Sequence, residues 1–168
     1  THRGQLVPVA QLLDRGPAVQ AELRELIDAH APAGERAALI RRLDHLAAEH
    51  CRCIPAAIAA LGRHDMAAFG QAVDRSQQGA EQLLGNQVEA TCYLAAEARR
   101  QGATAASAFG AGFGGSVWAM IPIDAAPDFA RRWQRAYEDR FADYRAACRF
   151  FITHGSIPAT ALAALPHG

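Results

Sequence analysis

The sequence predicts an α+β fold in which helices cover one side of a small antiparallel sheet of three or four strands. Up to Gly102, apolar side chains recur at the three- and four-residue spacing of amphipathic helices. Beyond Gly102 the pattern changes to short apolar runs rich in β-branched and aromatic residues, which are typical of strands. Helices and strands that are segregated along a chain are typical of the α+β class.

The first two predicted helices are separated by the proline and glycine of "HAPAGE". Pro17 begins a helix that ends near Ala29, because proline is favoured in the first helical turn. Its apolar face comprises Val19, Leu23, Leu26 and Ile27. A long helix follows over residues 35–61, and Pro55 inside it is expected to kink or divide it. Its apolar stripe comprises Leu39, Leu43, Leu46, Ile54, Ile58 and Leu61.

Two further helices precede the sheet. Asp65 is placed to cap the first of them, which fades near "LLGNQ". The side chains that it turns inward are expected to be Met66, Phe69 and Val73. The second covers residues 88–100, and Gly102 is expected to end it in a left-handed conformation.

The predicted strands lie in the last third of the chain. "TAASAFG" and "SVWAMIPI" flank a run of glycines, and "CRFFITH" forms a last strand after a helix over residues 126–144. That helix carries Phe129, Trp133, Ala136 and Tyr137 on one face. We expect one domain over residues 1–168, with residues 1–34 as a peripheral helical lead-in and residues 35–168 as the core.

Composition excludes several functions. The formal charge is zero, with 17 basic and 17 acidic residues, so no nucleic acid or anionic membrane partner is expected. All the basic residues are arginine, which excludes any mechanism that needs a lysine of this chain. No apolar run is long enough to cross a membrane and no signal peptide is visible at the start, which favours a cytoplasmic protein.

The segment "HLAAEHCRC" holds two histidines and two cysteines. Cys51 and Cys53 are two apart on a predicted helix and therefore point to different sides of it. The second half of a zinc-binding pattern is missing. We therefore expect no metal site, and no disulfide in a chain of cytoplasmic type.

The stretch "SAFGAGFGGSVWAMI", residues 107–121, places four glycines within six positions. A dinucleotide-binding loop would begin a helix, whereas a strand follows here. Protein kinases and P-loop enzymes need a lysine, which the chain lacks. Two interpretations remain: a hairpin whose glycines allow positive φ angles and close packing, or a backbone surface that lies beside a ligand with its N–H groups turned outward.

The same stretch resembles the third conserved motif of the GHMP kinases, in its galactokinase form. Upstream, "RRLDHLAAEHCRCIPAAIAALGRHDMAAFGQAVDRSQQ" resembles the galactokinase helices, and "FFITHGSIPATAL" resembles the closing strand. The resemblance runs in the right order from about Arg41 to Leu162. It implies a GHMP kinase C-terminal domain of ferredoxin-like type.

The resemblance further implies the C-terminal half of a sugar kinase that phosphorylates a sugar or sugar-acid hydroxyl with ATP and Mg²⁺. Both would be bound mainly by an N-terminal half, which would carry the sugar motif, the serine-rich phosphate loop and the catalytic residues. No catalytic or metal-binding residue is therefore expected in this chain, which alone should fold without activity. The residues expected to close the cleft beside the phosphate loop are Gly110, Ala111, Gly112, Phe113, Gly114, Gly115 and Ser116.

Two departures from galactokinases lead us to expect that galactose is not the best substrate. Ser116 stands where a cysteine often follows the glycines, and "EQLLGNQVEATCYL" replaces a tyrosine-containing stretch. The alternatives are a regulatory homologue that senses sugar and nucleotide without turnover, and a stand-alone interaction domain. The expected partners are the sugar, ATP and the protein's own N-terminal domain. Phe113 should be exposed in the isolated chain, where such a patch favours self-association.

Overall fold

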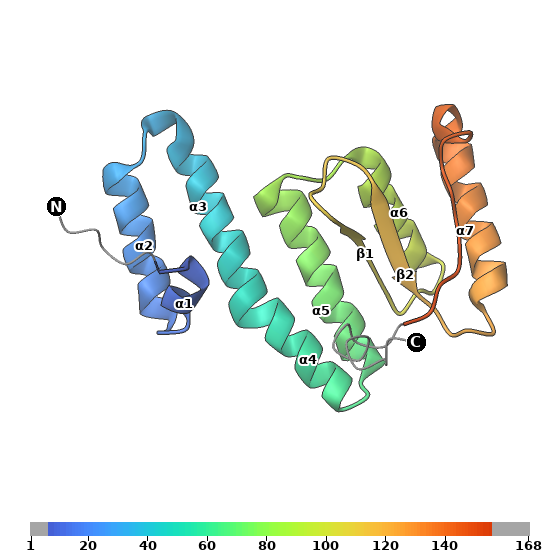
Figure 1. The fold of residues 1–168 in the computed structure, drawn as a ribbon, viewed down its shortest axis with the longest axis horizontal. Helices are drawn as coiled ribbons and strands as arrows, with labels where there is room; N and C mark the ends of the chain where they lie inside the picture. The colour runs from blue at the N-terminus through green and yellow to red at the C-terminus, as the bar shows by residue number, and fades with distance from the viewer. Residues whose placement is uncertain (1–6, 156–168) are drawn as a thin grey trace, which may run out of the picture. The chain divides into compact units, whose positions relative to one another are not determined.

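A computed structural model describes residues 7–155 (Figure 1). It divides between Ile121 and Pro122 into two compact units, each of which is described by itself. The first unit holds α1 to α6 and both strands, and the second holds α7 and a short 3₁₀ turn. The α+β class predicted from the sequence is confirmed. No helix within residues 7–155 is long and apolar enough to span a membrane.

The first unit begins with α1 (Val9–Leu13) and α2 (Pro17–His30). Pro17 is the first residue of α2, as predicted. A small core forms where these helices meet α3 (Ala33–Ala48), and it comprises Leu13, Leu43 and Ala47 with Leu23 and Ile27 packed against them. Leu26, predicted on the same face, is instead 55% exposed.

Pro55 divides the predicted long helix, as expected. A five-residue π-helical turn, η1 (Glu49–Cys53), joins α3 to α4 (Ile54–Gly62), so the helix continues through it (Figure 1). Proline has no N–H to donate, and its ring clashes with the carbonyl four residues earlier in a regular helix. The wider hydrogen-bond spacing of a π-turn accommodates this defect.

The predicted apolar stripe of this helix is wrong in most positions. Leu43 is buried, but the other five residues are exposed, and Ile58 is the most exposed of them at 65%. The π-turn lies at residues 49–53, and the residue that it inserts rotates by about 100° only the part of the stripe that follows it, from Ile54 on. The buried face is formed instead by small side chains, namely Ala47, Cys53 and Ala60.

Helices α5 and α6 have the predicted start and stop signals. In α5 (Met66–Gly79), the Ala68 N–H donates to Asp65 Oδ1 over 2.9 Å, which confirms the cap. Val73 is buried, whereas Met66 is exposed at the first position of the helix. After the π-turn η2 (Ala80–Leu84), the chain reaches α6 (Glu89–Arg100).

Gly102 ends α6 with a φ of +100°, as predicted. The N–H groups of Gly102 and Ala103 donate to the carbonyls of Arg99 and Ala98. This is the Schellman arrangement, in which a residue with positive φ follows the helix and satisfies its last carbonyls. The turn delivers the chain directly into the first strand.

The sheet of the first unit is a two-stranded antiparallel hairpin. β1 (Ala105–Phe109) pairs with β2 (Ser116–Met120), from Ala105 opposite Met120 to Phe109 opposite Ser116. Helices α5 and α6 both pack on β1, and α6 also packs on β2. The hairpin is thus held against two helices with its connecting loop at the far end from Ala105.

The predicted count of three or four strands is wrong for the described residues, which contain two. The third predicted strand, residues 148–154, pairs with no strand within residues 7–155. In the second unit Phe150 packs on α7 (Ala126–Arg140), with its ring centroid 5.2 Å from that of Trp133 and 5.9 Å from that of Tyr137. These aromatic contacts hold the segment along the helix (Figure 1).

Helix α7 buries the aromatic face that the sequence predicted. Phe129, Trp133 and Tyr137 are all buried, and burial raises the pKa of the Tyr137 phenol. The helix ends at Arg140 rather than at Tyr144, because a 3₁₀ turn, η3 (Ala142–Tyr144), takes over. The Phe141 ring between the two segments packs on the ring of Tyr137 at 5.1 Å.

Candidate functional site

The glycine-rich loop, residues 110–115, joins β1 to β2 and has an unusual backbone. All four of its glycines have positive φ, at +90° (Gly110), +86° (Gly112), +114° (Gly114) and +98° (Gly115). Phe113 is also left-handed, at +60°. Side chains with a Cβ are strained at such angles, so the loop needs its glycines for its shape alone.

Most of the N–H groups in this loop have no hydrogen-bond partner within residues 7–155. Only the Phe113 N–H is bonded, to the Asn86 carbonyl oxygen at 2.5 Å. The unbonded donors are the N–H groups of Gly110, Ala111, Gly112, Gly114 and Gly115. The loop has no titratable side chain. It can therefore offer hydrogen bonds to an anion, but it cannot transfer a proton.

The glycines differ in how much space a Cβ atom would have at each position. A Cβ on Gly112 would lie 2.3 Å from the Asn86 carbonyl oxygen and 2.5 Å from its Nδ2. A Cβ on Gly110, Gly114 or Gly115 would meet nothing within 4 Å. Close packing inside the chain therefore explains the missing side chain at Gly112 only.

The other predicted site residues lie in the same hairpin. The Ala111 carbonyl accepts a hydrogen bond from Asn86 Nδ2 at 3.1 Å. Ser116 is the first residue of β2 and is exposed opposite Phe109. Phe113 is 76% exposed, which confirms the expectation for that side chain. The structure thus brings all seven predicted residues together at one end of the hairpin.

Asn86 is the residue at this site that sequence reasoning missed. It lies in the connection between η2 and α6, 25 residues before the carbonyl to which its side chain donates. The one signal in the sequence is that its segment, "LLGNQ", departs from the galactokinase pattern. In the sequence that departure points to the choice of sugar, whereas the structure places the segment against the glycine-rich loop.

Gln77 of α5 anchors the start of the glycine motif. Its Oε1 atom accepts hydrogen bonds from the Ser107 hydroxyl at 3.0 Å and from the Ala108 N–H at 2.9 Å. Gln77 is 6% exposed, and its Nε2 atom donates to Glu81. A buried amide with both ends satisfied fixes its neighbours firmly. The β1 edge at Ala108 is thereby bonded to a helix instead of a third strand.

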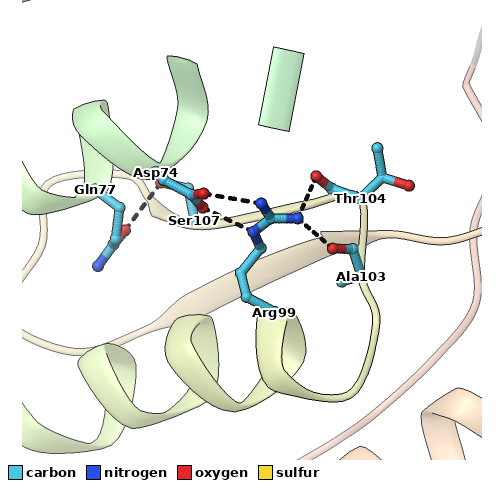
Figure 2. A network of polar contacts seen from close by, with 6 residues as sticks. All are labelled: Asp74, Gln77, Arg99, Ala103, Thr104 and Ser107. Carbon is cyan, nitrogen blue, oxygen red and sulfur yellow. Dashed lines mark hydrogen bonds and ion pairs between the residues drawn. The ribbon is translucent and has the colours of Figure 1, made fainter. Parts of the chain in front are cut away.

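Arg99 ties both helices to the beginning of β1 (Figure 2). Its Nε and Nη2 atoms each lie 2.8 Å from a carboxylate oxygen of Asp74 in α5. Its Nη1 atom donates to the carbonyls of Ala103 and Thr104. A bidentate arginine–carboxylate ion pair is directional as well as attractive, so it helps to set the angle between α5 and α6.

Gly70 makes this arrangement sterically feasible. A Cβ at Gly70 would lie 2.1 Å from the Thr104 carbonyl oxygen and 3.2 Å from Arg99 Nη2. The glycine therefore lets α5 approach the chain just before β1. Gly70 and Phe69 lie in the upstream stretch that resembles the galactokinase helices.

The cysteine and histidine cluster has a different environment. Burial, and then Glu49, raise the pKa of the Cys53 thiol, which disfavours the thiolate that metals bind. Cys51 is exposed, and His50 Nε2 lies 2.6 Å from Asp14 Oδ1. In the described part of the chain, no group of three or more histidine, cysteine or acidic side chains could hold a metal ion.

Three comparisons with known proteins bear on this site. Residues 57–139 match the family model described as GHMP kinases C terminal. The galactokinases of Mycobacterium tuberculosis H37Rv and Mycobacterium bovis are 32% identical over 143 residues, which is 85% of this chain and 36% of theirs. The chain therefore spans about a third of the length of these curated relatives.

A solved structure shows the same fold. The crystal structure of Lactococcus lactis galactokinase complexed with galactose superimposes with a TM-score of 0.61 at 24% sequence identity. The match covers 80% of this chain and 35% of that one. At this level of identity the likeness bears on the fold.

Proposed function

The chain carries a GHMP kinase C-terminal domain of the galactokinase-like type, and we propose that the whole protein is an ATP-dependent sugar kinase. In this proposal the domain contributes one wall of the active-site cleft. The observation that supports it is the loop of unbonded N–H groups, residues 110–115, which lies inside the matched family region.

The glycine-rich loop would face the phosphates of ATP. Phosphate oxygens accept hydrogen bonds from backbone N–H groups, and such donors favour negative charge without any charged side chain. Because Gly110, Gly114 and Gly115 have open space where a Cβ would lie, a phosphate or a neighbouring loop could approach their backbone closely. These features fit ATP, and residues 110–116 are assigned to that contact.

Catalysis itself is assigned to the part of the protein outside this chain. Phosphoryl transfer depends on groups that position the phosphates and the hydroxyl, and on charges that stabilise the transferring group. The loop supplies neutral donors and no acid or base. Mg²⁺ is assigned to the outside part as well, because the described residues contain no cluster of acidic ligands.

The test is ATP turnover by the full-length protein with a panel of sugars and uronic acids. We expect sugar-dependent ADP release, fastest with a substrate other than galactose. That expectation comes from the sequence, which departs from the galactokinase pattern at Ser116 and in "EQLLGNQVEATCYL", whereas the contacts of Asn86 itself are with the glycine-rich loop. Fastest turnover on galactose would contradict the specificity, and binding of sugar and nucleotide without any turnover would favour a sensor instead.

The isolated chain is the control for this assay. We expect it to unfold cooperatively, since α5, α6 and the hairpin share hydrogen bonds through Gln77 and Arg99. It should release no ADP with any sugar above background. Sugar-dependent ADP release from a homogeneous sample of the isolated chain would place the catalytic residues here and overturn the assignment.

A further inference from the structure

Asn86 occupies an unusual position between two parts of the fold. Gly85 ends η2 in a left-handed conformation, and its N–H donates back to the Ala80 carbonyl at 2.9 Å. The chain leaves the helix at that point, and α6 begins three residues after Asn86. Asn86 therefore lies in a short connection that both helices constrain.

From this connection Asn86 holds the glycine-rich loop on both sides of Gly112. Its backbone carbonyl accepts from the Phe113 N–H at 2.5 Å, and its Nδ2 atom donates to the Ala111 carbonyl at 3.1 Å. Gly112 lies between these bonds, and its Cα approaches Asn86 too closely for any Cβ. Two hydrogen bonds and one steric contact thus set where the tip of the loop lies.

The Asn86 side chain is itself oriented by α6. Its Oδ1 atom accepts from Gln87 Nε2 at 2.9 Å, and Gln87 Oε1 accepts from the Thr91 hydroxyl at 2.9 Å. Thr91 is 2% exposed and its hydroxyl also accepts from the Val88 N–H. The Thr91 hydroxyl also lies 3.0 Å from the Val88 carbonyl oxygen, so its one proton is shared between two acceptors. In this arrangement the Asn86 amide turns its oxygen toward Gln87 and its N–H group toward the loop.

Within the described residues, the hydrogen bond from the Phe113 N–H to the Asn86 carbonyl is the one bond that the loop's N–H groups donate. It turns one donor inward, while the five remaining donors have no partner within the described residues. A hydrogen bond on each side of Gly112 therefore determines how those five donors are presented. Loss of the side-chain bond would allow the loop, which is rich in glycine, to sample other conformations.

We propose that Asn86 is a positioning residue, which holds the glycine-rich loop in the conformation that binds the phosphates of ATP. The inference rests on the proposed function of the loop. It predicts that Asn86 affects the nucleotide and not the sugar, because its contacts are with Ala111, Gly112 and Phe113.

The test compares Asn86→Ala with wild type in the full-length protein. We expect the KM for ATP to rise about tenfold, the effect of one hydrogen bond, with the KM for the sugar little changed. Asn86→Asp keeps the oxygen that Gln87 binds but replaces the donor to Ala111 and adds a charge, so it should raise the KM for ATP further. Gln20→Ala is the matched control, because it removes a side-chain amide from a hydrogen bond to Asp44 in the α2–α3 pair.

Direct titration with ATP separates this inference from the proposed function. If the full-length protein turns over no sugar but Asn86→Ala weakens ATP binding about tenfold, the proposed activity fails and the positioning role stands. An unchanged affinity for ATP in Asn86→Ala overturns the positioning role by itself. Equal changes in both KM values with a lowered Tm would likewise overturn it, in favour of general destabilisation. A full-length protein that binds no ATP overturns both.

Discussion

Gly114→Ala is expected to lower kcat/KM of the full-length protein by about 100-fold with its best sugar, the order of effect of misplacing reacting groups by an ångström. Gly114 has a φ of +114°, and a Cβ there would meet no atom of the described residues within 4 Å. Apart from the backbone strain, which the control variant below shares, a methyl group at this position would therefore obstruct what approaches the loop from outside. If the loop faces ATP, what approaches it is the nucleotide and its phosphate loop.

Gly102→Ala is the matched control for this variant. Gly102 has a similar φ of +100° and the same open surroundings, but it lies at the end of α6. Both variants should lose stability from backbone strain, of order 1–3 kcal/mol. Only Gly114→Ala should lose turnover, so normal turnover in that variant would contradict the role of the loop. Gly112 is unsuitable for this test because Asn86 fills the space beside it.

Gly70→Ala is expected to lower the free energy of unfolding by about 3 kcal/mol or more, at the upper end of overpacking effects. The added Cβ would lie 2.1 Å from the carbonyl oxygen of Thr104, which is backbone and cannot rotate away. Relief requires α5 to move from the start of β1, which would break the bonds of Arg99 to Asp74. Denaturant unfolding of the isolated chain, monitored by circular dichroism, measures the effect.

Gly34→Ala is the control for the Gly70 substitution. Gly34 is near the start of α3, and a Cβ there would meet nothing within 4 Å. Alanine is favoured over glycine in helices, so this change should be neutral or slightly stabilising. If Gly70→Ala proves as harmless as Gly34→Ala, the close packing of α5 on the strand is incorrect.

Local signals predicted the helices of this chain well. Pro17, Asp65 and Gly102 each have a strong preference for one helix terminus, and each lies where that preference places it. The division of the long helix also followed from Pro55. Which face the second half of that helix buries did not follow, because the π-turn inserted at residues 49–53 changes the register of what comes after it.

The number of strands depended on contacts that the sequence does not display. Residues 148–154 have the composition of a strand, but Phe150 finds aromatic partners on α7. Gln77, predicted only as part of a helix, bonds to the β1 edge at Ala108. Both outcomes depend on which distant side chain is nearest, and composition alone cannot predict that.

The sequence predicted where the candidate site lies but did not identify all of its residues. The high density of glycines between two strands identified residues 110–115, because few residues other than glycine adopt a positive φ. Asn86 was not identified, since an asparagine before a helix is ordinary and its contact with Ala111 spans 25 residues. The resemblance to galactokinases located the loop, and the structure separated Gly112, which packs on Asn86, from the three glycines beside which no described residue packs.

The most direct measurement is amide hydrogen exchange over residues 109–116 of the full-length protein, with and without a saturating non-hydrolysable ATP analogue. We expect the N–H groups of Gly110, Ala111, Gly112, Gly114 and Gly115 to become protected when the nucleotide binds, because they have no partner within the described residues before it. The Phe113 N–H, already bonded to Asn86, should change least. Unchanged exchange across the loop in protein that has bound the analogue would contradict the claim that this loop contacts the phosphates.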